Sequence, residues 1–256
     1  MTFEQITVQQ DGAVVWLTLN RPDHANALTL PLAQEFCAAI AQAEADPGCQ
    51  VLILQGAGRF FCAGGDVEGM AASDDPATFL GALAEQMHVG LLALAQSRLV
   101  TIAAVHGPAA GAGLGLVLNA DFVLASPSAS FLTAYAGVGL TPDCGVSYLL
   151  PQLVGPRRAM EMAVGGRVVT ADEALDWGLI TELVSAAELR SRAGSLGAQL
   201  SAGATQVIGP TKRLLTAERL AGYADHLADE AQTISAMITD PDTQERLARF
   251  VQRRRG

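Results

Sequence analysis

The sequence predicts an α/β fold in which alternating strands and helices form a core and helices form the C-terminal region. Short apolar runs bounded by glycine alternate with segments of helical periodicity over the first two thirds of the chain. From Pro156 onward helical patterns dominate. With 256 residues, of which 50% are hydrophobic and 16% charged, the chain can bury a large core.

The N-terminal segment predicts a strand hairpin, a helix and a buried strand. ITVQQDGAVVWLTLNRP (6–22) contains two short strand patterns joined at an Asp11–Gly12 turn. Residues 28–48 carry apolar side chains at helical spacing and end in the breaker Asp-Pro-Gly. The apolar run VLILQG (51–56) favours a strand buried on both faces.

The same order recurs in the middle of the chain. A glycine-rich loop, GAGRFFCAGGDVEGM (56–70), leads into a helix start, and a long helical pattern follows to about residue 95. The next predicted elements are a buried strand at 99–105, a tight turn at 107–113, a buried helix at 114–120, a strand at 121–126, an extended segment at 131–138 and a helix opened by Thr141-Pro142-Asp143. Helices of the last third are predicted at 156–164, 171–177, 186–202, 210–221, 223–238 and 241–254.

Charge and composition exclude several classes of partner. The net charge of −10 and a sequence pI near 4.8 argue against binding of nucleic acid or an anionic membrane through bulk charge. Residues 99–118 are apolar, but one histidine, one proline and four glycines favour a buried strand, turn and helix over a membrane span. The N-terminus lacks a signal-peptide pattern, and the four cysteines form no C-x-x-C pair. We therefore expect a cytoplasmic protein without nucleic-acid or membrane partners.

Several common chemistries lack their motifs in this chain. There is no P-loop, no complete G-x-G-x-x-G, no H-E-x-x-H and no G-x-S-x-G, and the four histidines are scattered. We therefore expect no metal ion and no nucleotide cofactor. Lys212 is the only lysine and lies outside the motif-rich part of the chain, which argues against Schiff-base chemistry.

Two loops of small residues stand between a predicted strand and a helix. They are Ala63-Gly64-Gly65-Asp66 and Ala110-Gly111-Ala112-Gly113. Such loops let a ligand approach the backbone closely and present unpaired N–H groups to it. Two N–H groups that converge on one oxygen would form an oxyanion hole. The alternative is that the glycines only permit close packing of each helix on its strand.

Three segments resemble the enoyl-CoA hydratase/isomerase (crotonase) superfamily: FCAGGDVEGM, AAVHGPAAGAGLGLVLNADFVLAS and GLTPDCGVSYLLPQLVGPRRAMEMAVGGRVVTADEALDWGLI. The resemblance extends over nearly the whole chain. It implies a ββα spiral core with the CoA and acyl site over 1–200. It also implies a C-terminal helical region over 201–256 that forms a homotrimer or a dimer of trimers.

The resemblance further implies an acyl-CoA thioester as substrate, with coenzyme A as part of the substrate and no permanently bound cofactor. The thioester oxygen would accept hydrogen bonds from the N–H groups of Gly65 and Ala112. Residues implied in binding the substrate or its CoA portion are Ala25, Ala63, Gly64, Gly111, Tyr135 and, from a neighbouring subunit, Lys212.

The chain departs from the hydratase pattern of the family. Hydratases carry two glutamates that activate the added water and protonate the substrate carbon, and the matching positions here are Gly115 and Tyr135. Neither residue can act as a carboxylate base. Hydration by the paired-glutamate route is therefore not expected.

Asp143 is the acid that the family resemblance places at the site. Its segment resembles isomerases that shift an acyl-CoA double bond, especially the 1,2-epoxyphenylacetyl-CoA isomerase type, which use one aspartate as a proton shuttle. An apolar pocket would raise the pKa of Asp143 into a useful range. A purely structural alternative is that Asp143 caps the helix that follows it.

Two further interpretations remain open. In the 4-chlorobenzoyl-CoA dehalogenases of this superfamily an aspartate in a similar segment is the nucleophile, with a histidine base and a tryptophan in place of Tyr135. His88 does not match that histidine convincingly, so this interpretation ranks second among enzymes. A protein that binds CoA or assembles without turnover is the alternative from another class.

Other polar residues are assigned ordinary structural roles. Asp66 is expected to cap a helix and Asp121 to be a buried structural acid at the start of a strand. Arg21, Arg59 and Arg157 either contact the phosphates of CoA or are simply solvated.

Overall fold

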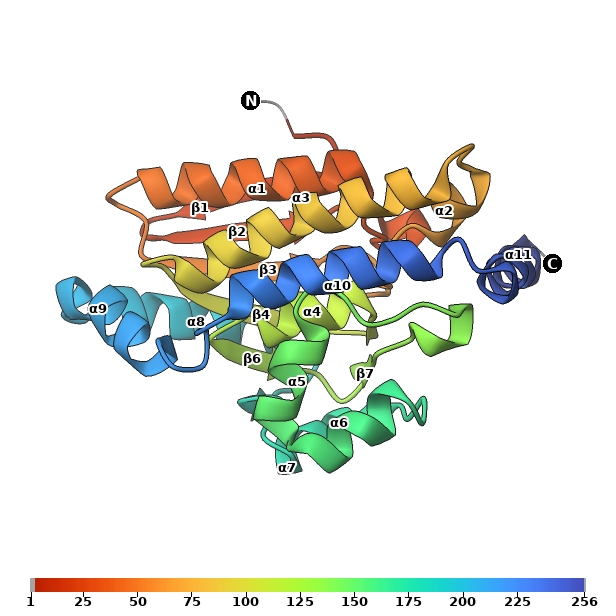
Figure 1. Cartoon of the computed structure of the whole chain (residues 1–256). Coiled ribbons are helices and arrows are strands. Elements are labelled where there is room, and N and C mark those ends of the chain that lie inside the picture. The colour runs from red at the N-terminus through yellow and green to blue at the C-terminus, as the bar shows by residue number, and fades with distance from the viewer. Residues whose placement is uncertain (1–2, 256) are drawn as a thin grey trace.

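A computed structural model describes residues 3–255 and contains a six-stranded sheet, ordered β1-β2-β3-β4-β6-β9 (Figure 1). β1 and β2 pair antiparallel, and the other neighbours pair parallel. The strands of this sheet are β1 (Ile6–Asp11), β2 (Val14–Leu19), β3 (Val51–Gly56), β4 (Val100–Val105), β6 (Phe122–Ala125) and β9 (Glu182–Leu183).

A small second sheet lies beside the first. It is ordered β5-β7-β8, with strands β5 (Ala109–Ala110), β7 (Ser130–Leu132) and β8 (Val169–Thr170). β5 comes directly before the helix that starts at Ala112, so this small sheet fixes the second loop of small residues. The fold is α/β with mixed sheets and C-terminal helices, as the sequence predicted.

Helices cover the sheet and continue past it. They are α1 (Leu30–Ala45), α2 (Val67–Ala72), α3 (Pro76–Gln96), α4 (Ala112–Leu118), α5 (Val146–Val154), α6 (Pro156–Ala163), α7 (Ala171–Asp176), α8 (Leu189–Ser201), α9 (Thr205–Thr216), α10 (Tyr223–Met237) and α11 (Pro241–Arg255). Two short 3-10 helices, η1 (Pro22–His24) and η2 (Ala136–Val138), complete the elements.

Side chains alternate along the strands between two hydrophobic layers. Val14 and Trp16 face the smaller layer, which α8 covers, whereas Val15, Leu17 and Leu19 face the larger one. The same period of two holds in β3 and β4. The larger layer contains α1, α3, α4 and α10, and the pocket described below opens within it.

The predicted helices and strands are largely confirmed, but the short strands β8 and β9 were not predicted, α8 begins at Leu189 rather than at 186, and three further places differ. Residues 131–138 are not one extended segment, because Ala134 has a φ of 61° and the chain turns into η2. The helix expected to open at 141–143 begins at Val146. α9 begins at Thr205 rather than at Pro210, and this proline lies inside the helix.

The apolar segment 99–118 forms β4, β5 and α4, which confirms the strand, turn and helix predicted for it. Among residues 3–255, α3 is the helix whose length and hydropathy would suffice to cross a membrane. Its apolar residues include Leu80, Leu91 and Leu94, which are buried in the core. α3 packs against α1 on one side and against α10 on the other (Figure 1).

The C-terminal helices share the core of the preceding residues. Tyr223, Leu227 and Ile234 of α10 belong to the larger hydrophobic layer. α9, by contrast, exposes Leu214 and Leu215. The division at residue 200 and the role of the last helices in assembly stay predictions.

Candidate active site

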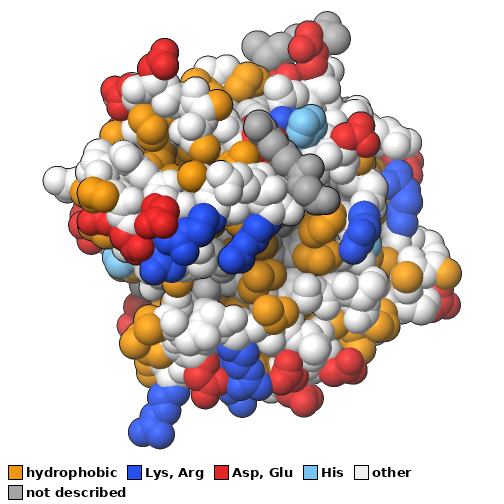
Figure 2. All heavy atoms as spheres, turned by 90° about the vertical axis from the view of Figure 1, so that its right-hand side faces the viewer, with side chains coloured by type: hydrophobic (Ala, Val, Ile, Leu, Met, Phe, Trp, Pro, Cys, Tyr) orange, Lys and Arg blue, Asp and Glu red, His pale blue; other side chains and the backbone are white. Residues whose placement is uncertain are grey.

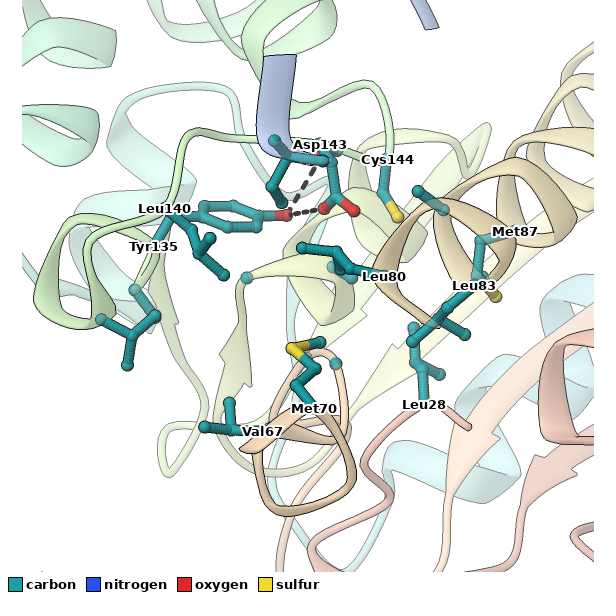
Figure 3. Close-up of a pocket in the computed structure, with 18 of the residues that line it drawn as sticks. Leu28, Val67, Met70, Leu80, Leu83, Met87, Tyr135, Leu140, Asp143 and Cys144 are labelled. Carbon is teal, nitrogen blue, oxygen red and sulfur yellow. Dashed lines mark hydrogen bonds between the residues drawn. The ribbon is translucent and has the colours of Figure 1, made fainter. Parts of the chain in front are cut away.

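A mostly apolar pocket lies where α3, the loop after β3, the start of α4 and the segment from η2 to α5 meet (Figure 3). Its cavity volume is about 80 Å³, within a wider space of about 650 Å³ that includes open solvent. Its apolar walls are formed by Leu28, Val67, Met70, Leu80, Leu83, Ala84, Met87, Val138, Leu140, Ile234 and Phe250. Such walls favour an apolar acyl group over a polar one.

Most of the residues predicted for the site line this pocket. They are Ala63, Gly64, Gly65, Gly111, Ala112, Tyr135 and Asp143. The structure therefore brings together segments that are separated by up to eighty positions in the sequence.

The two loops of small residues lie against each other. A Cβ atom built on Gly64, which has a φ of +96°, would lie 3.5 Å from the amide nitrogen of Ala112 and 3.0 Å from the Ala110 carbonyl oxygen. A side chain at Gly64 would therefore force the loops apart. Asp66 accepts a hydrogen bond from Gly69 N–H (3.2 Å), which confirms its predicted role as a helix cap.

Neighbouring amides in these loops are paired, but the two predicted donors are not. Ala63 N–H donates to Ala25 O (3.0 Å), and Gly111 N–H donates to Leu132 O (3.1 Å). Within the described chain, the N–H groups of Gly65 and Ala112 have no acceptor. Both residues line the pocket, so both N–H groups are available to an oxygen of a ligand.

Asp143 is buried and paired with one hydroxyl group. Its side-chain Oδ1 accepts a hydrogen bond of 2.6 Å from the Tyr135 hydroxyl, and the residue is 6% exposed (Figure 3). Burial raises the pKa of Asp143, and the Tyr135 hydroxyl opposes part of that rise. Burial and the neighbouring carboxylate raise the pKa of Tyr135 well above its usual range, so the hydroxyl keeps its proton.

His88 lies beside Asp143, which the sequence interpretation did not foresee. One donor atom each from His88, Asp143 and Cys144 lie within 4.8 Å of one another. Ala84, His88, Leu91 and Ala95 share the buried face of α3. A histidine on an otherwise apolar helical face was therefore the feature of the sequence that could have indicated a polar partner for His88 in the core.

The hydrogen bonds of this cluster limit what His88 can do. Its Nε2 accepts from the Cys144 amide N–H at 3.2 Å, so the lone pair on that nitrogen is occupied. Burial lowers the pKa of His88 to about 4 and raises that of the Cys144 thiol well above its usual range. With a neutral ring and a protonated thiol, the cluster offers one carboxylate, which suits proton transfer better than metal binding.

Gly115 lies where no side chain fits. A Cβ atom there would lie 2.6 Å from the Cys144 carbonyl oxygen and 2.8 Å from the Cys144 Cβ. These atoms belong to the segment that carries Asp143, so any side chain at residue 115 must displace it. The first glutamate of the hydratase pattern is therefore excluded by backbone packing as well as by the sequence.

Lys212 is buried within the chain. It lies outside the pocket and is 8% exposed, with Nζ 2.8 Å from Asp121 Oδ2. Nζ also donates to the carbonyl oxygens of Leu99 (2.9 Å) and Leu94 (3.3 Å). All three ammonium hydrogens thus have acceptors inside the chain. The contact with the CoA of a neighbouring subunit stays a prediction.

The same contacts confirm Asp121 as a structural acid, since its Oδ2 also accepts from Thr101 N–H and Oγ1–H, both at 2.8 Å.

Ala25 lies behind the first loop, where its carbonyl oxygen accepts from Ala63 N–H (3.0 Å), and it does not line the pocket. Arg21 donates to the Ala27 carbonyl oxygen (2.5 Å), so it is not simply solvated.

Comparison with known proteins identifies the family. The family model described as enoyl-CoA hydratase/isomerase matches residues 9–256, and the chain belongs to this family. The chain is 33% identical over 250 residues to 4-chlorobenzoyl coenzyme A dehalogenase-2 of Arthrobacter sp, covering 96% of this chain and 90% of that protein. It is 36% identical over 214 residues to 1,2-epoxyphenylacetyl-CoA isomerase of Escherichia coli (strain K12), covering 83% of this chain and 82% of that protein.

A solved structure agrees with this family. The crystal structure of an enoyl-CoA hydratase from Mycobacterium avium subsp. paratuberculosis K-10 superposes with a TM-score of 0.89 at 32% identity. The match covers 98% of this chain and 97% of that one. The protein is therefore an acyl-CoA-processing enzyme with the crotonase fold.

Introducing the missing glutamate is expected to harm the protein without restoring hydration. In Gly115→Glu the new side chain displaces the Asp143 segment, so we expect no hydration of a 2-enoyl-CoA and a loss of about 1–3 kcal/mol in the free energy of unfolding. Gly137→Ala is the matched control, because a Cβ atom there meets no heavy atom within 4 Å. Urea unfolding and an absorbance assay for the enoyl thioester measure both effects. A stable Gly115→Glu variant that hydrates the substrate would show that the packing argument is wrong.

Removing the single lysine is expected to affect stability and not substrate binding. Lys212→Met leaves Asp121 without its cation, so we expect the free energy of unfolding to fall by about 3 kcal/mol while KM for a CoA thioester changes less than about twofold. Arg213→Met removes an exposed cation from the same helix and serves as the control. A large rise in KM with unchanged stability would instead support the contact with CoA.

Proposed function

We propose that the protein is an acyl-CoA isomerase that shifts a carbon–carbon double bond, or opens a ring epoxide, with Asp143 as the single proton carrier. The observation that carries this proposal is the environment of Asp143. It is the one acid among the described residues that line the pocket, and it shares the pocket with the free N–H groups of Gly65 and Ala112. A single buried carboxylate facing an oxyanion hole suits removal and return of one proton.

For a 3-enoyl-CoA the steps balance without water. The Asp143 carboxylate takes a proton from C2, and the electron pair moves to the thioester oxygen, where the N–H groups of Gly65 and Ala112 stabilise the enolate. The enolate collapses to form the C2=C3 bond while C4 takes the proton from the Asp143 carboxyl group. Asp143 ends ionised, as it began.

The mostly apolar walls have two consequences for this chemistry. They raise the pKa of Asp143, which makes the carboxylate a stronger base than an exposed aspartate. They also keep water away from the enolate, which disfavours competing hydration. The Tyr135 hydroxyl stabilises the ionised form of Asp143 through the 2.6 Å hydrogen bond.

Two observations favour the dehalogenase alternative: His88 lies beside Asp143, and the chain is 33% identical to a 4-chlorobenzoyl coenzyme A dehalogenase. Hydrolysis of an aspartyl ester would need a base to activate water. The Nε2 lone pair of His88 accepts the Cys144 N–H, so His88 does not supply that base in this arrangement. Release of halide from a haloaroyl-CoA would nevertheless identify this second candidate directly.

The surroundings of the site are compatible with an anionic CoA thioester despite the net charge of −10. Figure 2 shows the end of the molecule that carries α11, where several basic side chains lie among hydrophobic ones. The proposal includes a cytoplasmic location. It also includes assembly as a homotrimer or dimer of trimers, supported by the exposed Leu214 and Leu215 of α9.

Replacing the proton carrier is expected to abolish turnover while leaving binding intact. Asp143→Asn keeps the shape of the side chain, so we expect kcat for a 3-enoyl-CoA to fall about 1,000-fold with little change in the affinity for a CoA thioester. Tyr135→Phe removes the hydroxyl that favours ionised Asp143, so the loss of activity at low pH should begin at a higher pH than in the unmodified protein.

The direction of this pH dependence follows because the ionised carboxylate of Asp143 is the active form. Activity is present above the raised pKa of Asp143 and is lost as the pH falls through it. Asp74→Asn, which removes an exposed carboxylate, serves as the control. The assay uses 2-enoyl, 3-enoyl and ring-epoxide CoA thioesters with mass spectrometry of the products. Equal isomerisation by Asp143→Asn would refute the proton-carrier role, and binding without any turnover would favour the CoA-binding alternative.

A further inference from the structure

Glu230 of α10 is a buried carboxylate that contacts the segment carrying Asp143. It is 4% exposed, and it does not line the pocket. Its Oε2 accepts from Gly145 N–H at 2.7 Å and its Oε1 accepts from Ser147 N–H at 3.1 Å. The Ser147 hydroxyl donates to Oε1 as well.

These contacts satisfy amides that the local helix cannot satisfy. Gly145 and Ser147 stand at the start of α5, where the first N–H groups have no acceptor within the helix. Gly145 is two residues after Asp143, so a carboxylate that binds both amides also limits where the Asp143 backbone can lie. Glu230 therefore acts as a cap supplied from a distant helix.

A second residue of α10 supports the same segment. A Cβ atom at Gly145 would overlap the Tyr223 hydroxyl group, so the Tyr223 ring lies directly under the segment. The Tyr223 hydroxyl donates to Asn119 Oδ1 (2.9 Å), and Asn119 Nδ2 donates to Gly115 O (2.8 Å). This chain of contacts joins α10 to α4, the helix whose first residue, Ala112, supplies one of the oxyanion-hole donors.

We propose that Glu230 is a positioning residue for proton transfer, which holds the segment 143–147 in place through the amides of Gly145 and Ser147. The inference rests on the proposed role of Asp143 as proton carrier. Glu230 does not touch the acyl pocket, so its effect on the reaction passes through the position of Asp143.

The burial of Glu230 makes this support dependent on pH. The titratable groups that face it are His226 on its own helix, with Nε2 3.9 Å from Oε1, Tyr223, and the pocket residues Asp143, Cys144 and Tyr135. Burial raises the pKa of Glu230 to about 7, because its hydrogen bonds offset only part of the desolvation. Below that pH the carboxyl group carries a proton and loses part of its capacity to accept from the two amides.

Kinetics of two variants and one control test the inference. In Glu230→Gln the side chain keeps its shape but presents an NH₂ group to one of the amides, so we expect kcat to fall about 100-fold while KM changes less than about threefold. The step in the pH profile of kcat near pH 7 should disappear, leaving only the step of Asp143. Asp229→Asn removes an exposed carboxylate next to Glu230 and should leave both kcat and the pH profile unchanged.

Amide hydrogen exchange on the full-length protein supplies a measurement that needs no turnover. We expect faster exchange of the Gly145 and Ser147 amides in Glu230→Gln and in Glu230→Ala, and in the unmodified protein below about pH 7 after correction for the intrinsic rate. Unchanged exchange at these amides, or a Glu230→Gln variant with kcat within about threefold of the unmodified protein, would overturn the inference.

The two measurements separate this inference from the proposed function. If no substrate is isomerised but the two amides lose protection in the variants, then Glu230 holds the segment and the assigned reaction is wrong. If Asp143→Asn abolishes isomerisation while Glu230→Gln does not slow it, then the reaction stands and the positioning role is wrong.

Discussion

The hydrogen bond between the Tyr135 hydroxyl and the Asp143 carboxylate is the interaction on which the site depends. A carboxylate that is 6% exposed in a mostly apolar pocket would be expensive to keep ionised without a donor. The Tyr135 hydroxyl, 2.6 Å from Oδ1, and the Cys144 side chain both donate to the carboxylate and stabilise the anion. The same burial that raises the pKa of Asp143 keeps the Tyr135 hydroxyl protonated, so the pair is stable as donor and acceptor.

The rest of the site is assembled from backbone. The proposed oxyanion hole uses two amide N–H groups, and the close approach of residue 115 to the Cys144 carbonyl leaves no room for a side chain at residue 115. One carboxylate is sufficient where the backbone stabilises the charge that develops on the substrate.

The sequence predicted those parts of the site that depend on local residues or on motifs. Small residues after a buried strand indicated the loops of Gly65 and Ala112, and the segment 139–150 indicated Asp143. The hairpin, the buried strands and most helices followed from periodicity and turn residues. Helix boundaries near 141–146 and at α9 were less accurate, since tertiary contacts decide where those helices begin.

The parts that could not be predicted depend on contacts between distant segments. The acceptors of Lys212 could not be predicted, because they lie at the end of α3 and just before β4 and β6, about 90 to 120 positions earlier in the chain. His88 and Glu230 reach the Asp143 segment across 56 and 85 positions, respectively. No local sequence pattern predicts such hydrogen bonds between distant residues. A polar residue on a buried helical face indicates only that a partner exists.

The transfer of one proton from C2 to C4 by Asp143 is tested most directly with an isotope label. A 3-enoyl-CoA deuterated at C2 is isomerised in ordinary water, and the position of the label is read by mass spectrometry and NMR. If Asp143 carries the proton within a site that excludes water, a substantial share of the deuterium reappears at C4 of the 2-enoyl product. Complete loss of the label to solvent, with none at C4, would contradict a single buried proton carrier.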